Sequence, residues 1–296
     1  MGFNTVDQLY NAITTNGQIL ALPFTRTIQT GATSAAGRFH ELLSGGGTGG
    51  AMTLTGTAGT GIATSATTVG ALPIGPAVET SQTKHLLSMT VNTPATTVTP
   101  AYLVLTDIIH IYPSLVMVTT PSTLSNHPTW TGTGDTRMSN AKGVQLSALL
   151  TTASSAAGQI TPTYLDQDGN SQATARSMHG PVAAHPAGAL FGDVGVTATP
   201  GGYVAPLAVG DYGVQRVSSY AINTGATGGT GCFILHRPVA TIPLAAGNTP
   251  TVYDFTTGPL RLPRIYDGAC LGFFIQIGGA MTTGNVITGE LVYGWA

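Results

Sequence analysis

The sequence predicts an all-β fold, a jelly-roll or Greek-key β-sandwich with one short helix near the N-terminus. Two observations predict it. After residue 16 the chain contains about ten to twelve short segments rich in β-branched and aromatic residues, separated by turns rich in glycine and proline. No segment after residue 16 shows the spacing of an amphipathic helix, and no repeat period indicates a solenoid or a propeller.

The predicted helix covers residues 4–16. Thr5 is placed to cap its first turn, and Gln8 follows three residues later, as in a capping box. Because a helix this short is marginal alone, we expect it to pack on a sheet edge of its own subunit or on a neighbouring subunit. Its apolar residues form one stripe, and we take them as candidate interface residues: Val6, Leu9, Tyr10 and Ile13.

The predicted strands follow in chain order. They cover residues 18–29, 37–43, 85–91, 102–112, 144–150, 159–165, 172–176, 213–223, 232–236, 271–277 and 286–293. The continuous apolar run at 102–112 is typical of a central strand. We expect one hairpin between 144–150 and 159–165, and another at Asp168 and Gly169. Along 213–223 we expect successive side chains to point alternately to the two faces of the sheet.

The domain organisation predicted from the sequence is simple. Residues 1–35 form the N-terminal helix and an extended arm, and residues 36–296 form one β-sandwich domain. Within it, residues 44–70 consist almost wholly of glycine, threonine, alanine and serine, and we expect an irregular surface excursion there. The longest apolar stretch, residues 103–118, contains Asp107, His110 and Pro113, so no membrane span is expected.

The low content of charged residues is the most informative feature of the composition. Charged residues make up 7% of the chain, whereas an ordinary soluble domain has about 25%. The formal net charge is −2, and a surface with so little self-repulsion favours association. We therefore expect a homo-oligomer or a close-packed assembly, with a neutral secreted β protein as the alternative. No basic run indicates a nucleic-acid partner.

Motifs that carry chemistry are absent from the sequence. The segment DQDGN at 166–170 lacks the glycine and glutamate positions of a calcium loop, and the glycine-rich runs lack the lysine of a P-loop. We expect no catalytic residue, no cofactor and no metal site, although paired carboxylates far apart in sequence stay open. Cys232 and Cys270 are expected to be buried thiols, and whether they pair is left open.

Four arginines in the last third of the chain complete the candidate interface: Arg216, Arg237, Arg261 and Arg264. With so few charges, each is expected to pair with a carboxylate such as Asp211, Asp254 or Asp267, within the chain or across an interface. Trp130 lies in the polar segment TWTGTGD and is the candidate glycan contact.

Several blocks together resemble a family of structural proteins of tailed-bacteriophage virions, of the capsid decoration or minor capsid type. These blocks are MGFNTVDQL, SAAGRFHEL, SQTKHLLSM, YLVLTDIIHIYPSL, VAPLAVGDYGVQRV, FILHRPVATIPL and LPRIYDGACLGF. The resemblance covers most of the chain in scattered pieces, and the segment 44–70 has no part in it. It implies a virion protein whose partners are copies of itself and other capsid proteins, and it implies no catalytic residue.

Several roles in a virion remain open at this stage. A shell subunit of the common tailed-phage type is expected to have a long charged helix, which this sequence lacks, so a decoration or cement role is favoured. The alternatives are a major capsid or coat subunit, and a carbohydrate-binding host-attachment module of a tail or fibre. A hydrolase is a further rival.

Overall fold

The computed structural model describes residues 5–14, 17–28, 38–93, 101–117, 122–134, 136–152, 158–174, 177–179, 187–192, 202–224, 229–244, 247–257, 262–277 and 284–296. These residues form one helix and sixteen strands. In chain order they are α1 (Val6–Thr14), β1 (Ile19–Thr27), β2 (Arg38–Glu41), β3 (Ile62–Ala63), β4 (Lys84–Asn92), β5 (Ala101–Val116), β6 (Ser122–Thr123), β7 (Gln145–Leu150), β8 (Gln159–Asp166), β9 (Ser171–Ala173), β10 (Met178–His179), β11 (Val214–Thr224), β12 (Thr230–Leu244), β13 (Thr251–Asp254), β14 (Arg264–Ile265), β15 (Leu271–Ile277) and β16 (Val286–Trp295).

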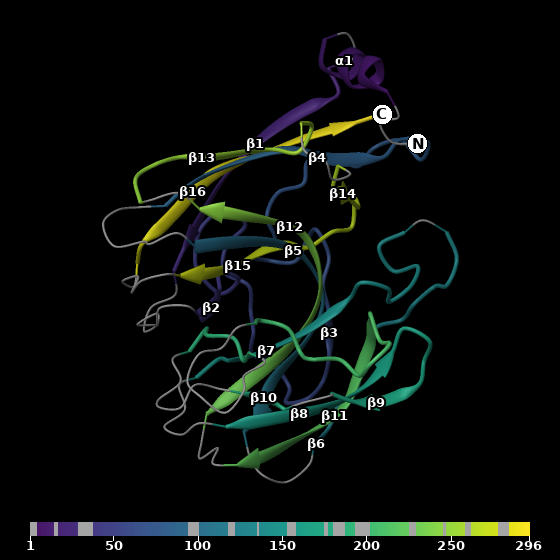
Figure 1. Ribbon diagram of the computed structural model, residues 1–296, viewed down its shortest axis with the longest axis vertical. Coiled ribbons are helices and arrows are strands. Elements are labelled where there is room, and N and C mark those ends of the chain that lie inside the picture. The colour runs from purple at the N-terminus through teal and green to yellow at the C-terminus, as the bar shows by residue number, and fades with distance from the viewer. Residues whose placement is uncertain are drawn as a thin grey trace.

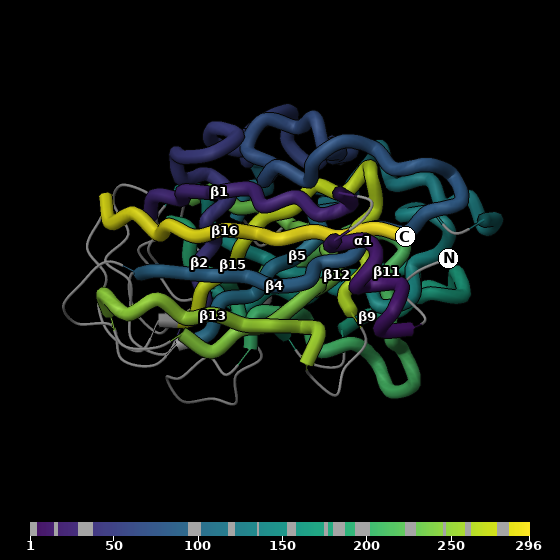
Figure 2. The backbone as a smooth tube through the Cα atoms, turned by 90° about the horizontal axis from the view of Figure 1, so that it is seen from above, coloured from purple at the N-terminus to yellow at the C-terminus, as the bar shows by residue number. Residues whose placement is uncertain are grey.

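The strands form three antiparallel sheets, stacked along the long axis of the molecule (Figure 1). The upper sheet has the order β1-β16-β4-β13, and Figure 2 shows these four strands side by side when the molecule is seen from above. The middle sheet has the order β2-β15-β5-β12-β7, with β3 beside β5. The lower sheet has the order β10-β8-β11-β6, with β9 beside β8.

Eight of these strands have the topology of a jelly roll. Taken in chain order, β1, β2, β4 and β5 pair antiparallel with β16, β15, β13 and β12, so the first strand meets the last and the fourth meets the fifth. This is one long two-stranded ribbon. The ribbon wraps because β16 also pairs with β4, and β15 also pairs with β5, which gives two four-stranded sheets face to face. The all-β sandwich expected from the sequence is confirmed.

The lower sheet is built from an insertion between the two longest strands. All its strands lie between the end of β5 and the start of β12, that is, at the tip of the wrapped ribbon. β7, from the same insertion, extends the middle sheet by pairing with β12. The long strands β5 and β12 therefore run from the jelly roll into the insertion and connect the two parts through a continuous ladder.

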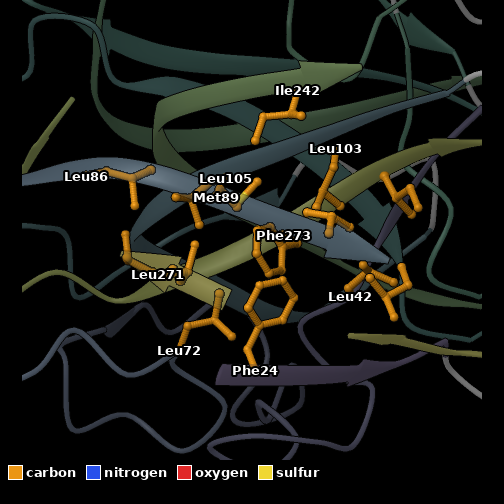
Figure 3. Packing of buried hydrophobic residues seen from close by; sticks show 14 of the residues in the cluster. Phe24, Leu42, Leu72, Leu86, Met89, Leu103, Leu105, Ile242, Leu271 and Phe273 are labelled. Atoms are coloured by element: carbon orange, nitrogen blue, oxygen red, sulfur yellow. The ribbon is translucent and has the colours of Figure 1, made fainter. Parts of the chain in front are cut away.

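Two separate hydrophobic cores lie between the sheets, one between the upper and middle sheets and one between the middle and lower sheets. Between the upper and middle sheets, Phe24 of β1 faces Phe273 of β15 with ring centroids 4.9 Å apart, surrounded by leucines of both sheets (Figure 3). Between the middle and lower sheets a second core contains Tyr112, Tyr164 and Phe233. One face of β5 serves both, since Leu105 lies in the upper core and Ile109 in the lower one.

The glycine- and threonine-rich segment 44–70 covers the remaining face of the middle sheet. It is mostly irregular, with β3 as its only strand among the described residues. Met52 and Leu54 pack there against Val104, Ile108 and other residues of the sheet. Glycine is required at Gly49, where φ is 82° and an added Cβ would lie 2.1 Å from the carbonyl oxygen of Ala71.

The structure corrects three expectations. Residues 18–29, assigned to an N-terminal arm, contain β1, which pairs with β16 along its whole length and is part of the sandwich. The strands at 144–150 and 159–165 form no hairpin, because β7 pairs with β12 while β8 pairs with β11 in another sheet. Regular alternation along β11 is interrupted by bulges, so that both Val214 and Val217 are buried.

Candidate functional site

Helix α1 forms as its sequence predicts. The backbone N–H of Gln8 donates to the side-chain oxygen of Thr5 at 3.2 Å, and the N–H of Leu9 donates to the carbonyl oxygen of Thr5 at 3.3 Å. Thr5 is therefore the N-cap. Asp7 adds a negative charge in the first turn, where the helix dipole favours it. In Figure 1 the helix projects at the top of the molecule, above the upper sheet.

The apolar stripe of α1 faces away from the protein. Ala12 is buried and Leu9 is half-buried. By contrast, Val6 is 81% exposed, Tyr10 is 63% exposed and Ile13 is 51% exposed. These three side chains follow the i, i+4, i+7 spacing, so they lie side by side on one helix face. The small face of the helix packs on the rest of the chain, and the large apolar face is exposed.

The arginines of the candidate interface are mostly engaged within the chain. Arg237 is half-buried, and its guanidinium donates to the carbonyl oxygens of Arg137 at 3.1 Å and of Asn140 at 3.0 Å. Arg264 lies over the ring of Tyr266, 4.6 Å from its centroid. Arg216 is also half-buried, and its charge, after burial, lowers the pKa of His127. Arg261 lies outside the described residues.

The three carboxylates expected to pair with these arginines have other partners. Asp267 forms an ion pair with Lys84, with Nζ 2.8 Å from Oδ1. Asp211 accepts a hydrogen bond from the hydroxyl of Tyr164 at 2.6 Å. Asp254 accepts from the hydroxyl of Thr256 at 2.6 Å. The exposed face of α1 is therefore apolar, and Arg237 holds a loop of the insertion in place.

A buried ionic network lies at the junction of jelly roll and insertion, where no local sequence pattern indicates one. Arg137, from the insertion, donates from Nε to both carboxylate oxygens of Asp107 on β5, at 3.0 and 2.9 Å. Its other nitrogens bond the backbone carbonyls of Thr64 and Ile108. The backbone N–H of Cys270 donates to Asp107 at 2.9 Å. Burial raises the pKa of Asp107, while the charge of Arg137 opposes that rise.

Beside this network lies a cleft of about 540 Å³. Its walls are residues 78–84 and 264–268 of the jelly roll and residues 136–138 of the insertion, with Ser65 at one side. Neither wall alone makes a cleft. The long gaps in sequence between the three segments explain why no local pattern predicted it.

A buried serine and histidine lie within hydrogen-bonding distance, but in a non-catalytic arrangement. Ser147 Oγ is 2.9 Å from His236 Nε2, and His236 Nδ1 is 2.8 Å from the hydroxyl of Thr106. The hydroxyl of Ser147 donates to the carbonyl oxygen of Tyr203, so the histidine donates from Nε2 to the serine. The serine is fully buried and its proton is directed away from the histidine, so this pair lacks an activated nucleophile.

Trp130, the candidate glycan contact, is half-buried against the lower core. Its indole N–H donates to the carbonyl oxygen of Gln215 at 2.9 Å. The ring is thus held by the protein itself, and a glycan contact there stays a prediction. Cys232 and Cys270 are free and buried, as expected. Among the described residues, no group of histidine, cysteine and carboxylate side chains could hold a metal ion.

Comparisons with known proteins add little. No protein-family model matches the chain, and no curated protein matches it. Among solved structures, the chain is similar at 11% identity and a TM-score of 0.17 to a chain of the structure of infectious bursal disease virus Gt strain, covering 94% of this chain and 80% of that one. A similarity this weak carries no argument. In the described part of the chain, no helix has the length and apolarity needed to span a membrane.

Proposed function

We propose that this protein is a structural subunit of a tailed-bacteriophage virion and works by packing against copies of itself or other capsid proteins. The observation that carries the proposal is the exposed apolar face of α1. Burying a side chain such as Val, Ile or Leu is worth roughly 1.5–3 kcal/mol. An isolated helix of nine residues is marginal. A partner covering Val6, Tyr10 and Ile13 supplies the missing burial.

The upper sheet offers a second contact through β13, its last strand among the described residues. At one end of this sheet, residues 45–48 cover β1, with Thr27 N–H donating to the carbonyl oxygen of Gly46. At the other end, β13 is the last strand in the order, and Val252 on it is 66% exposed. A strand from a neighbouring subunit could pair with β13 along this edge.

The role within the particle is best described as decoration, cement or minor capsid subunit. Jelly rolls serve in viral capsids and also in lectins, and a fold alone does not fix a function. A major coat subunit remains the alternative supported by this architecture. The charge-poor composition supports a protein covered by neighbours in either case, because water alone stabilises such a surface poorly.

Sedimentation velocity of the purified full chain, together with co-sedimentation with phage particles, tests the proposal. We expect concentration-dependent association, particle binding, or both. The double variant Tyr10→Glu/Ile13→Glu should abolish it, because the stripe becomes charged while helix propensity is kept. Asn11→Glu is the matched control, since Asn11 is an exposed α1 residue outside the stripe. A wild-type chain that stays monomeric at high concentration and binds no particle contradicts the proposal.

A further inference from the structure

The cleft between jelly roll and insertion has a chemical character that identifies a class of ligand. Its volume of about 540 Å³ falls within the range of about 300–1,000 Å³ typical of small-molecule sites. It lies between two separately packed parts of the chain, a common place for such sites. None of the roles proposed above uses it.

Two of the three cations that line the cleft, Lys84 and Arg137, are paired with carboxylates. Lys84 is paired with Asp267 at 2.8 Å and also donates to the carbonyl oxygen of Pro76 at 2.6 Å. Arg137 is paired with the buried Asp107. The third cation, Arg264, lies over the ring of Tyr266, and the exposed carboxylate of Glu79 also lines the cleft. An anionic ligand therefore gains little attraction, because the buried cations already have carboxylate partners.

The uncharged groups of the cleft combine hydroxyls with flat and aliphatic surface. The hydroxyls come from Ser65, Thr80, Thr83 and Thr136. Arg264 lies over the ring of Tyr266, with its guanidinium carbon 4.6 Å from the ring centroid, and we call this pair of cleft residues the platform. Val78, Ile265 and Met138 add aliphatic surface. A purely apolar ligand would offer these hydroxyls no hydrogen bond, whereas a sugar ring offers hydroxyls to the walls and C–H groups to the platform.

We propose that this cleft binds a neutral carbohydrate of one or two sugar rings. The proposal is independent of the assembly function, because it uses none of the residues of α1 or β13. A subunit exposed on a particle surface could thus also contact glycans of the host.

The test starts from a panel of neutral and anionic oligosaccharides offered to the full chain on an array, followed by titration calorimetry or ligand-detected NMR. We expect binding of at least one neutral oligosaccharide. Tyr266→Ala should weaken it at least tenfold, since the platform is lost. Tyr212→Ala is the matched control, because Tyr212 also lies under a cation, Lys142 at 6.0 Å from its centroid, but outside the cleft.

A second variant keeps the proposal testable if Tyr266→Ala fails to fold. Gly268 lines the cleft, and a Cβ added there meets no atom within 4 Å, so Gly268→Leu adds bulk without a clash. It should also weaken binding at least tenfold. Gly46→Leu is its control, since that position is equally open and lies elsewhere. The proposal is overturned if the wild type binds no neutral oligosaccharide, prefers the anionic ones, or keeps its affinity in both Tyr266→Ala and Gly268→Leu. Sedimentation of Gly268→Leu separates this outcome from a failure of assembly.

Discussion

Arg137 and Asp107 form a buried ion pair at the boundary between two hydrophobic cores. The side chain of Arg137 is 10% exposed and that of Asp107 is 5% exposed, with Nε 2.9 Å from Oδ2. Leu105, two residues before Asp107, lies in the upper core, and Ile109, two residues after it, lies in the lower core. The pair therefore fixes where the insertion sits on β5.

Removing the arginine should destabilise the protein strongly. Arg137→Met leaves the Asp107 carboxylate buried without its counter-charge, which costs about 3–5 kcal/mol in such sites. Urea unfolding at pH 7 measures the loss. The double variant Arg137→Met/Asp107→Asn should lose less than the single one, because no uncompensated charge remains. A single variant within about 1 kcal/mol of the wild type would argue against this role.

The same variant should show a characteristic pH dependence. Arg137→Met removes the charge and the hydrogen bonds of Arg137, while the Cys270 N–H and the charge of Arg237 still oppose the effect of burial, so the pKa of Asp107 in the folded state rises further above the ordinary value. A carboxyl with a raised folded pKa favours the folded state at low pH and loses that contribution as the pH rises. The deficit relative to wild type should thus shrink as the pH falls below the raised pKa.

His236 should make the protein acid-sensitive. Burial lowers the pKa of His236 to about 3. Below pH 6.5 this histidine is therefore protonated in the unfolded chain, whereas in the folded chain it stays neutral down to about pH 3. The contribution to stability is present above pH 6.5 and is lost as the pH falls through this window. His236→Gln, which can still donate and accept hydrogen bonds, should flatten the dependence. Equal slopes for both proteins between pH 6.5 and pH 4 would refute the assignment.

Gly289 on β16 should tolerate no side chain. A Cβ there would lie 2.1 Å from the carbonyl oxygen of Thr90 and 2.6 Å from Cζ of Phe24. Because β16 is paired on both sides, the backbone cannot easily move. Gly289→Ala should cost about 1–3 kcal/mol or more in thermal or urea unfolding. Gly268→Ala, in open space, should change stability by less than about 0.5 kcal/mol.

The two cysteines should be unreactive in the native protein. Burial raises the pKa of Cys270 to about 11 and raises that of Cys232 well above its ordinary value. Since the thiolate is the reactive form, a thiol reagent at pH 8 should label neither residue until urea unfolds the chain. Mass spectrometry then counts two labels. Rapid labelling of the folded chain would show that these strands open readily.

Features encoded locally were predictable from the sequence, and features that depend on distant pairing were not. Thr5 caps α1 as its sequence indicates, and the turn at Gly169 joins β8 to β9. The partner of β7 could not be predicted, because β12 lies far along the chain and no short turn connects the two strands. Periodicity likewise located the stripe of α1 but not its direction, because the small Ala12 provides the contact instead.

In the candidate site, too, single residues could be picked out from the sequence, but their distant contacts could not. Arg237 and Arg264 could be singled out from the sequence because charges are rare, but a sequence pattern does not show that Arg237 bonds the backbone of a loop or that Arg264 lies over an aromatic ring. The role of Arg137 could not be predicted, since it lies thirty residues after Asp107 and outside any strand, where no periodicity relates the two. The cleft could not be predicted from the sequence for the same reason, because its walls come from segments far apart in the chain.

The place of the insertion has a consequence for how such a chain can diversify. Val116 and Thr230, where the insertion leaves and rejoins the long strands, are direct register neighbours. Any polypeptide whose own ends meet could replace it, provided that it covers Tyr112 and Phe233 with an apolar face of its own. Lineages could therefore exchange whole outer modules while inheriting an unchanged scaffold.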